Sequence, residues 1–253
     1  TYVARRIARP KLEGEQWVRV TAMGGFRQVG RSASLLTTRE SKILIDCGLD
    51  PSSDNTPYFG IPEVQPLADI DAVVVTHAHL DHCGTLPALY KYGYKGPVYC
   101  TPPTRDLMAL LQLDNIKLGF GENKKTPYEA QHVRQEILHT IPLKYNEVTD
   151  IAPDVRLTFY NAGHILGSAI AHFHVGEGLH NVAFSGDTKY EKTWLFNPAN
   201  TRFPRLETFV MESTYGGHND MQPSRADASE QLGQYLQQAV EHGGHVLIPV
   251  FAV

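Results

Sequence analysis

The sequence predicts an α/β fold in which helices face mixed β-sheets. Short runs that alternate apolar and polar residues dominate the first part of the chain, whereas helical periodicity begins later and is interleaved with further short strands. This order favours mixed sheets over a purely parallel, doubly wound fold. A chain of 253 residues with 42% hydrophobic and 20% charged residues is also large enough to bury the core that such a fold needs.

The first half of the chain contains a predicted antiparallel meander. Residues 1–12 carry four basic side chains without a clear period, and we interpret them as a linker or the tail of an upstream module. Three short alternating strands are then predicted, at 17–22, 34–38 and 42–46. The continuous apolar run 71–76 predicts a buried strand, a helix is expected at 85–92, and another short strand at 97–100.

The second half alternates helices with strands. Helices are predicted at 103–118 and 126–139, the second with Thr126 as its cap and Pro127 in its first turn. Four strands are predicted, at 155–160, 169–175, 181–184 and 208–211. Ser224 begins a further helix that the pair Gly243-Gly244 ends.

The two ends of the chain indicate a longer protein. The sequence begins at Thr1 rather than at a methionine, and it stops inside the apolar run 245–253, which predicts a buried strand. Chain termini prefer exposed positions that tolerate change. We therefore expect the chain to be part of a longer protein.

Composition excludes several classes of protein. A balance of 23 Lys+Arg against 27 Asp+Glu gives no overall electrostatic case for a nucleic-acid or membrane-surface partner, so any such partner must be argued from a site. Three cysteines without a CxxC pair fit a reducing compartment, and we expect a cytoplasmic protein. No apolar run of eighteen residues and no leader peptide is present, which argues against a membrane. The 12 histidines are the first indication of metal or acid–base chemistry.

The segment Thr76-His-Ala-His-Leu-Asp-His82 directly follows the predicted strand 71–76 and contains four residues of metal-binding type. In an extended segment His77 and His79 point to the same side, and the turn after them can send Asp81 and His82 toward a second position. This spacing allows two metals. Imidazole and carboxylate donors without a thiolate pair suit Zn²⁺ in a site open to water, and Mn²⁺ or Fe would fit the same donors. The alternative is a solvated histidine-rich loop.

Three further residues at strand ends complete the candidate centre. His164 and Asp187 each follow a glycine directly after a predicted strand, where backbone can approach a crowded site. Asp46 ends the strand 42–46, where a buried carboxylate would orient a ligand imidazole. The alternative interpretation of each is a polar residue in an ordinary turn. The alternating His172 and His174 lie within a strand and are interpreted as one face of a sheet.

In this order, Asp46, the 77–82 cluster, His164 and Asp187 resemble the metallo-β-lactamase superfamily. The segment Met211-Glu-Ser-Thr-Tyr-Gly216 is similar to the acidic motif that opens its β-CASP branch, as in archaeal and bacterial relatives of the endonuclease subunit of the cleavage and polyadenylation specificity factor. The resemblance implies an αββα sandwich of two mixed sheets, truncated before most of the inserted β-CASP domain.

The resemblance also implies a division of the chain into three parts. Residues 1–12 would be a linker or the tail of an upstream module, which in archaeal members is often an RNA-binding KH domain. Residues 13–222 would form the N-terminal part of the metallo-β-lactamase domain. Residues 223–253 would begin the β-CASP domain.

The resemblance assigns a role to each matching residue. His77, His79 and His164 would hold one zinc ion, Asp81 and His82 the other, and Asp187 would bridge the two. The expected catalytic residues are Asp81, Asp46, which supports the ligands, and Glu212, which would orient a histidine that protonates the leaving oxygen. In the family that histidine lies downstream of this chain.

The resulting expectation is a zinc-dependent ribonuclease that hydrolyses phosphodiester bonds of single-stranded RNA by a hydroxide bridging two metals, as an endonuclease and also a 5′-to-3′ exonuclease. It would act in RNA 3′-end processing or transcription termination, with the full-length protein as a homodimer. Two alternatives stay open. One is another hydrolase on the same fold, acting on a thioester, a lactam or a small phosphodiester, and the other is an inactive scaffold subunit.

Overall fold

The computed structural model describes residues 2–53, 57, 59–121 and 126–250, and it divides into two compact units, Thr1–Glu212 and Ser213–Val253. The predicted boundary between residues 222 and 223 stays a prediction. The first unit holds two mixed sheets, which confirms the predicted fold class.

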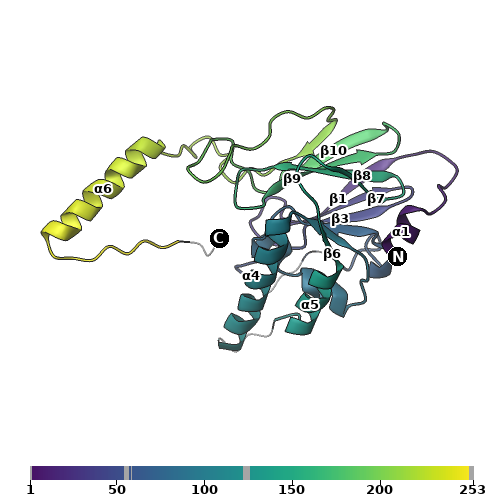
Figure 1. The fold of residues 1–253 in the computed structure, drawn as a ribbon, viewed down its shortest axis with the longest axis horizontal. Helices are drawn as coiled ribbons and strands as arrows, with labels where there is room; N and C mark the ends of the chain where they lie inside the picture. The colour runs from purple at the N-terminus through teal and green to yellow at the C-terminus, as the bar shows by residue number, and fades with distance from the viewer. Residues whose placement is uncertain (1, 54–56, 58, 122–125, 251–253) are drawn as a thin grey trace. The chain divides into compact units, whose positions relative to one another are not determined.

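The first sheet has six strands in sequence order, of which Figure 1 labels β1, β3 and β6. Its strands are β1 (Val18–Gly24), β2 (Ala33–Thr38), β3 (Lys42–Ile45), β4 (Ala72–Val74), β5 (Val98–Cys100) and β6 (Thr140–Pro142). The first three pair antiparallel, which confirms the predicted meander, and the remaining pairings from β3 to β6 are parallel. Parallel pairing places the ends of β3 and β4 at one edge of the sheet, where Asp46 and the histidine cluster begin.

The second sheet has the strand order β11-β10-β9-β8-β7. Its strands are β7 (Val148–Ala152), β8 (Val155–Asn161), β9 (Ala169–Val175), β10 (His180–Phe184) and β11 (Thr208–Val210). All pairs are antiparallel except β10 with β11. Large apolar side chains from both sheets, among them Leu36, Tyr99, Phe159 and Phe173, form one fully buried cluster that joins the sheets face to face.

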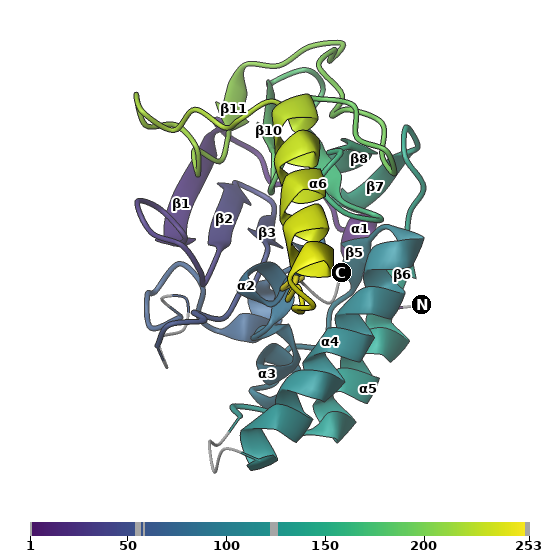
Figure 2. The same ribbon diagram turned by 90° about the vertical axis from the view of Figure 1, so that its left-hand side faces the viewer.

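Helices cover the outer face of the first sheet (Figure 2). They are α2 (Leu80–Cys83), α3 (Leu86–Lys91), α4 (Pro102–Gly121) and α5 (Ala130–His139), and a short 3₁₀ helix, η1 (Leu67–Asp69), precedes β4. Leu86, Leu89 and Met108 pack into a core with Leu35 and Leu44 of the sheet. The outer face of the second sheet is covered instead by an irregular segment that contributes Phe203 and Leu206.

The prediction for the start of α5 was wrong. The helix begins at Ala130 and not at Thr126, because Glu129 and His132 form a reciprocal capping box there. The Thr126 hydroxyl donates to the carbonyl of Tyr128 instead of capping the helix. The two strands that flank the following loop, β6 and β7, were not predicted at all.

Part of the stretch expected as a linker or tail is helical. Helix α1 (Tyr2–Ile7) is held by Arg6, whose Nε lies 3.0 Å from Asp71 Oδ1, and Arg9 lies 2.8 Å from the same oxygen. Asp71 is buried and also accepts from the backbone N–H of Lys42. The N-terminal basic residues therefore neutralise a buried carboxylate at the start of β4.

The second unit contains helix α6 (Arg225–Glu241), which begins as predicted, since Ser224 accepts a hydrogen bond from the Asp227 backbone. The predicted buried strand 245–253 is not formed: residues 245–250 are irregular and exposed, and 251–253 lie outside the described residues. A strand is buried only against paired neighbours, and a unit with one helix offers too little apolar surface to cover it.

Glu136 of α5 is fully buried and receives one hydrogen bond, from Gln112 Nε2 at 3.1 Å. Burial raises the pKa of this carboxyl well above its ordinary value, and the bond from Gln112 offsets only part of the effect. The folded state therefore holds a proton that the unfolded state releases above its ordinary pKa near 4.5. The protonated carboxyl of Glu136 therefore makes its full contribution to the free energy of unfolding below that pH. This contribution is lost as the pH rises toward the folded-state pKa.

The wild type is therefore expected to lose stability between pH 5 and pH 8, and Glu136→Gln is expected to abolish this loss. The difference in unfolding free energy between variant and wild type should shift in favour of the variant by up to about 1.4 kcal/mol per pH unit. Urea unfolding at several pH values measures it. Glu177→Gln, at an exposed position, is the matched control. Parallel pH profiles of Glu136→Gln and wild type would contradict the prediction.

Candidate metal centre

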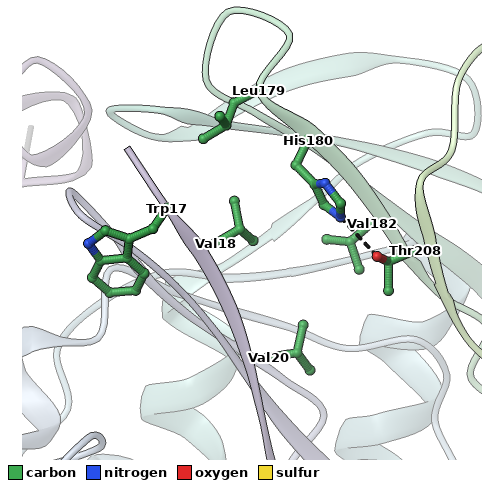
Figure 3. A pocket seen from close by; sticks show the side chains of 7 residues that line it. All are labelled: Trp17, Val18, Val20, Leu179, His180, Val182 and Thr208. Atoms are coloured by element: carbon green, nitrogen blue, oxygen red, sulfur yellow. Dashed lines mark hydrogen bonds between the residues drawn. The ribbon is translucent and has the colours of Figure 1, made fainter. Parts of the chain in front are cut away.

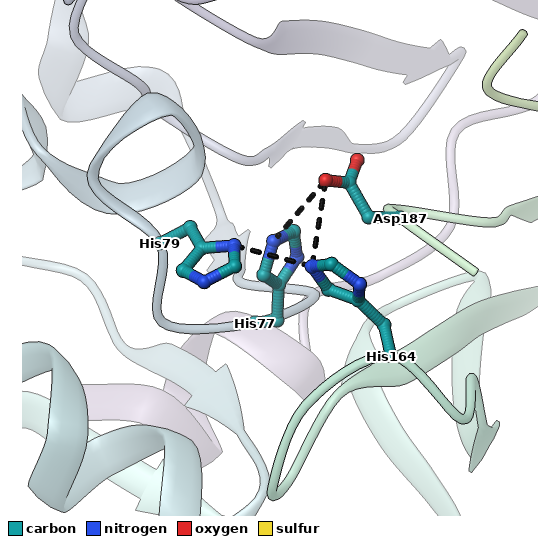
Figure 4. A group of neighbouring side chains, drawn as sticks. All are labelled: His77, His79, His164 and Asp187. Carbon is teal, nitrogen blue, oxygen red and sulfur yellow. Dashed lines mark hydrogen bonds and ion pairs between the residues drawn. The ribbon is translucent and has the colours of Figure 1, made fainter. Parts of the chain in front are cut away.

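Four of the candidate ligands gather at the ends of three strands (Figure 4). His77 and His79 follow β4, His164 follows β8 and Asp187 follows β10. One ligand atom from each lies within 4.8 Å of every other. Residues from both sheets therefore meet at one edge of the sandwich.

The geometry of these four residues fits a metal ion. His79 Nδ1 lies 3.2 Å from His164 Nε2, and Asp187 Oδ2 lies 3.6 Å from His164 Nε2 and 3.8 Å from His77 Nε2. Two nitrogens bound tetrahedrally at the usual Zn–N length are about 3.3 Å apart. His77 Nε2 is buried and makes no hydrogen bond with any described residue, which is costly unless an ion binds it.

Asp81 and His82 lie beside this group rather than within it. His82 Nε2 is 3.2 Å from Asp187 Oδ1 and 3.8 Å from Asp81 Oδ2. The two oxygens of Asp187 thus face two different sets of donors: Oδ2 faces His77 and His164, and Oδ1 faces His82. A carboxylate in this position is suited to bridge two ions.

Asp46 hydrogen-bonds the segment that carries the histidines. Its Oδ1 accepts from the backbone N–H of Thr76 at 2.8 Å, and its Oδ2 lies 2.8 Å from both the Thr76 hydroxyl and His82 Nδ1. The Thr76 hydroxyl is also 3.1 Å from His77 Nδ1. One buried carboxylate therefore sets the ring orientations that present Nε2 of His77 and His82 to the centre.

Asp46 adopts a left-handed backbone conformation, with φ of 57°. This conformation is uncommon for a residue with a side chain and is found where the surrounding structure imposes it, often at functional sites. The turn allows the Asp46 carboxylate to reach back under Thr76 and His82.

The electrostatics divide the histidines into neutral and charged members. Burial, with the nearby imidazoles, lowers the pKa of His77 well below its ordinary value, and burial also lowers the pKa of His164 against the opposing charge of Asp187. Burial would lower the pKa of His82 too, but Asp46 and Asp187 outweigh it and raise that pKa well above its ordinary value. Neutral imidazoles are the form that binds metals, so His82 would have to release its proton when an ion binds there.

Glu212 lies on the same edge and fixes the segment that carries Asp187. Its Oε1 accepts from the backbone N–H of Thr188 at 2.7 Å, and its own N–H donates to the Ser185 hydroxyl at 3.1 Å. These bonds tie the residues on both sides of Asp187 to the end of β11. The sequence motif placed Glu212 near the centre but gave no sign of this contact.

The remaining histidines and the adjacent cysteine serve other purposes. His172 and His174 lie on one face of β9 with ring centroids 4.3 Å apart, as predicted. His132 belongs to the capping box of α5. Cys83 donates to the carbonyl of Ala78, and burial raises its thiol pKa well above the ordinary value, so it packs rather than ligates.

A pocket between β1 and β10 lies away from the metal ligands (Figure 3). It is lined by Trp17, Val18, Val20, Leu179, His180, Val182 and Thr208. His180 begins β10, whereas Asp187 follows the opposite end of that strand. His180 Nε2 is 2.8 Å from the Thr208 hydroxyl, and no candidate catalytic residue faces this pocket.

Asp46→Asn is expected to weaken metal binding about 10- to 100-fold, because the amide leaves His82 Nδ1 without its carboxylate acceptor. Competition against a chelator of known affinity measures the effect. Asp150→Asn, at an exposed position of β7, is the matched control and should bind metal as the wild type does. Equal affinities for Asp46→Asn and wild type would contradict the supporting role of Asp46.

Comparison with known sequences places this arrangement in a family. The sequence model of the metallo-beta-lactamase superfamily matches residues 27–238. The transcription termination factor FttA of Methanosarcina mazei is 61% identical over 253 residues, which cover 99% of this chain and 40% of that protein. Its namesake from Methanothermobacter thermautotrophicus is 55% identical over 249 residues, covering 97% and 39%. The chain therefore spans about 40% of the length of these curated relatives.

Comparison with solved structures supports the fold. A protein of unknown function from Enterococcus faecalis V583 has a TM-score of 0.54 at 16% identity, covering 88% of this chain and 57% of that chain. Likeness at this identity concerns the fold alone. None of the helices in the described ranges is long and apolar enough to cross a membrane.

Proposed function

This chain belongs to the metallo-beta-lactamase superfamily, as its ordered motifs predict, and we propose that it carries the metal-binding part of a zinc-dependent ribonuclease. The proposed substrate is single-stranded RNA. The observation that carries the proposal is the carboxylate of Asp187, whose two oxygens face two separate sets of donors. Paired ions clamp the attacking and leaving oxygens of a phosphodiester during displacement, so a two-ion centre favours this substrate.

The names of the relatives support the biological setting. Two proteins that share more than half of their matched residues with this chain are named transcription termination factors. Termination releases a nascent RNA, and hydrolysis of that RNA is one chemistry that would serve it. We therefore propose that the protein cuts transcripts during termination or 3′-end processing, endonucleolytically and also in the 5′-to-3′ direction.

The residues of the centre form two proposed sets of metal ligands. His77, His79 and His164 would hold one divalent ion, Asp81 and His82 the other, and Asp187 both. Bound ions would supply a water nucleophile at neutral pH and offset charge on the phosphoryl oxygens. Zn²⁺ fits the donors best, and Mn²⁺ or Fe would fit them as well.

The other residues position these ligands and serve the leaving group. Asp46 and Thr76 orient the imidazoles, and Glu212 fixes the segment beside Asp187. We propose Glu212 as the carboxylate partner of a histidine outside this chain that protonates the leaving oxygen. A carboxylate partner favours the charged form of such a histidine.

Incubation with labelled single-stranded RNA tests the proposal in the protein expressed from its complete reading frame. We expect cutting with Zn²⁺, loss of cutting with a chelator, and recovery when Zn²⁺ is restored. His79→Ala should be inactive, whereas His139→Gln, at an exposed position of α5, should cut normally. Cutting that resists the chelator, or no cutting with Zn²⁺ present, would overturn it. Hydrolysis of a lactam or thioester alone would instead favour another hydrolase of this fold.

A further inference from the structure

The loop 24–32, between β1 and β2, is attached to the backbone of the metal-binding segment. Ser32 N–H donates to the carbonyl of Asp81 at 2.9 Å, and the carbonyl of Ser32 accepts from Gly48 N–H at 3.0 Å. The N–H of Arg31 donates to Leu49 O at 2.7 Å. The end of this loop therefore has a fixed place directly beside Asp81.

The tip of the loop exposes an unusual set of side chains. Phe26 is 48% and Val29 71% exposed, and Arg27 between them is also exposed. Within the described ranges, no hydrogen bond or ion pair engages the Arg27 guanidinium, whereas Arg31 donates to Gln28 within the loop. The loop contains two arginines and no acidic residue, although the chain as a whole is acidic.

The backbone of this loop is strained at both arginines. Among the described residues other than glycine, positive φ angles occur at Arg27 (59°), Arg31 (43°), Asp46 and Asn146. Asp46 contacts the metal-binding segment, and both arginines belong to the loop that is attached to that segment at Asp81. Glycine adopts this conformation more readily than arginine, so the backbone preference does not account for an arginine at either position.

We propose that the tip of this loop binds the RNA strand next to the metal centre, with Arg27 contacting a backbone phosphate and Phe26 stacking on a base. This inference rests on the proposed function and names the residues that would hold the substrate. Arginine suits phosphate because its planar donors match the phosphate oxygens. A cation beside an exposed aromatic ring is the combination by which proteins hold single strands without reading their sequence.

The charge of the loop favours RNA over a protein partner as its occupant. A polyanion gains from the exposed guanidinium of Arg27, whereas Arg31 already donates to Gln28 and lies near Asp50. An exposed apolar tip alone would serve either partner. The attachment of the loop at Asp81 also places the end of the loop beside the metal-binding segment.

RNA binding tests the inference, measured by fluorescence anisotropy in the protein expressed from its complete reading frame. A labelled single-stranded oligonucleotide is titrated at several salt concentrations, with a chelator present so that the RNA stays intact. Three variants are compared with the wild type. Arg27→Gly fits the left-handed backbone and removes the charge, Arg27→Lys keeps the charge, and Phe26→Ala removes the ring. Arg134→Gln, exposed on α5, is the control.

The two contacts have different expected signatures. Arg27→Gly should lower the slope of log affinity against log salt by about 0.7, which is about a fivefold loss of affinity per decade of salt below 1 M. Arg27→Lys should restore the slope. Phe26→Ala should weaken binding about tenfold with an unchanged slope. Arg134→Gln should match the wild type in affinity and in slope.

Three results would overturn the inference. An unchanged slope in Arg27→Gly, while the wild type binds and cuts RNA, removes the loop contact and leaves the proposed function standing. Unchanged RNA binding with a lower melting temperature in Phe26→Ala would assign Phe26 to packing within the protein and not to a contact with RNA. A wild type that neither binds nor cuts RNA would remove both the inference and the proposed function.

Discussion

Asp187→Asn is expected to lower RNA hydrolysis by about 10³-fold or more. Asparagine preserves the shape of the side chain but removes the charge that faces His77 and His164 on one side and His82 on the other. The stabilisation that bound metals give to a phosphoryl transition state amounts to several kcal/mol, and about 1.4 kcal/mol corresponds to a factor of ten in rate. Single-turnover cleavage of labelled RNA measures the change.

The control for this variant is Asp150→Asn, which makes the same chemical change on the exposed side of β7. Its cleavage rate should equal that of the wild type. The melting temperature of the metal-free Asp187→Asn protein should show that the fold is retained. A rate above one tenth of the wild-type rate would contradict the bridging position of Asp187.

Gly48→Ala is expected to destabilise the protein by at least about 3 kcal/mol, the upper part of the range for an overpacked core. A Cβ at residue 48 would lie 1.6 Å from the carbonyl oxygen of Asp81, 2.3 Å from its carbon and 2.8 Å from the Ser32 nitrogen. All three atoms belong to backbone, so no side chain can rotate away. The backbone at Asp81 must move, and the metal-binding segment with it.

Thermal unfolding together with zinc content measures this effect. Gly233→Ala in α6 is the control, because a Cβ there meets no atom within 4 Å and alanine favours a helix. It should leave stability unchanged or raise it by up to about 1 kcal/mol. Wild-type stability and zinc content in Gly48→Ala would show that the 46–49 turn and Asp81 are not packed as described.

Much of the centre could be predicted because its residues occupy strand ends. The cluster 77–82, His164 and Asp187 each follow a run that reads clearly as a strand, and sheets bring strand ends together. The sequence could not show which nitrogen each histidine presents. His79 turns Nδ1 toward His164, whereas His77 turns Nε2 inward because Thr76 is near its Nδ1. The first orientation depends on a residue 85 positions away, and the second on a hydroxyl that Asp46 holds from 30 positions away.

The fold class and most of the strands could be predicted from the sequence, and the errors have identifiable causes. Strands β6 and β7 are short and lack a clear alternation, so they gain their structure from pairing with β5 and β8. The helix expected from Thr126 begins four residues later because a glutamate and a histidine cap it, a pairing outside the usual capping residues. The apolar run 245–253 predicted a strand from hydrophobicity alone, which says nothing about a partner.

The contacts of the loop 24–32 were also beyond reach of the sequence. Its glycines predict a turn between two strands, and the sequence lacks the Gly-Lys-Ser/Thr ending of a phosphate loop. The family resemblance implies that this loop lies near the cleft, and the hydrogen bond from Ser32 to the carbonyl of Asp81 shows how it is attached there. The positive φ angles of Arg27 and Arg31 likewise have no signature in the sequence.

Anomalous X-ray diffraction at the zinc edge tests the central claim most directly, on crystals of the protein expressed from its complete reading frame and loaded with Zn²⁺. Two peaks are predicted for each chain. One should contact His77, His79 and His164, the other should contact Asp81 and His82, and the carboxylate of Asp187 should touch both. A single peak, or peaks that leave Asp187 uncoordinated, would contradict the two-ion centre.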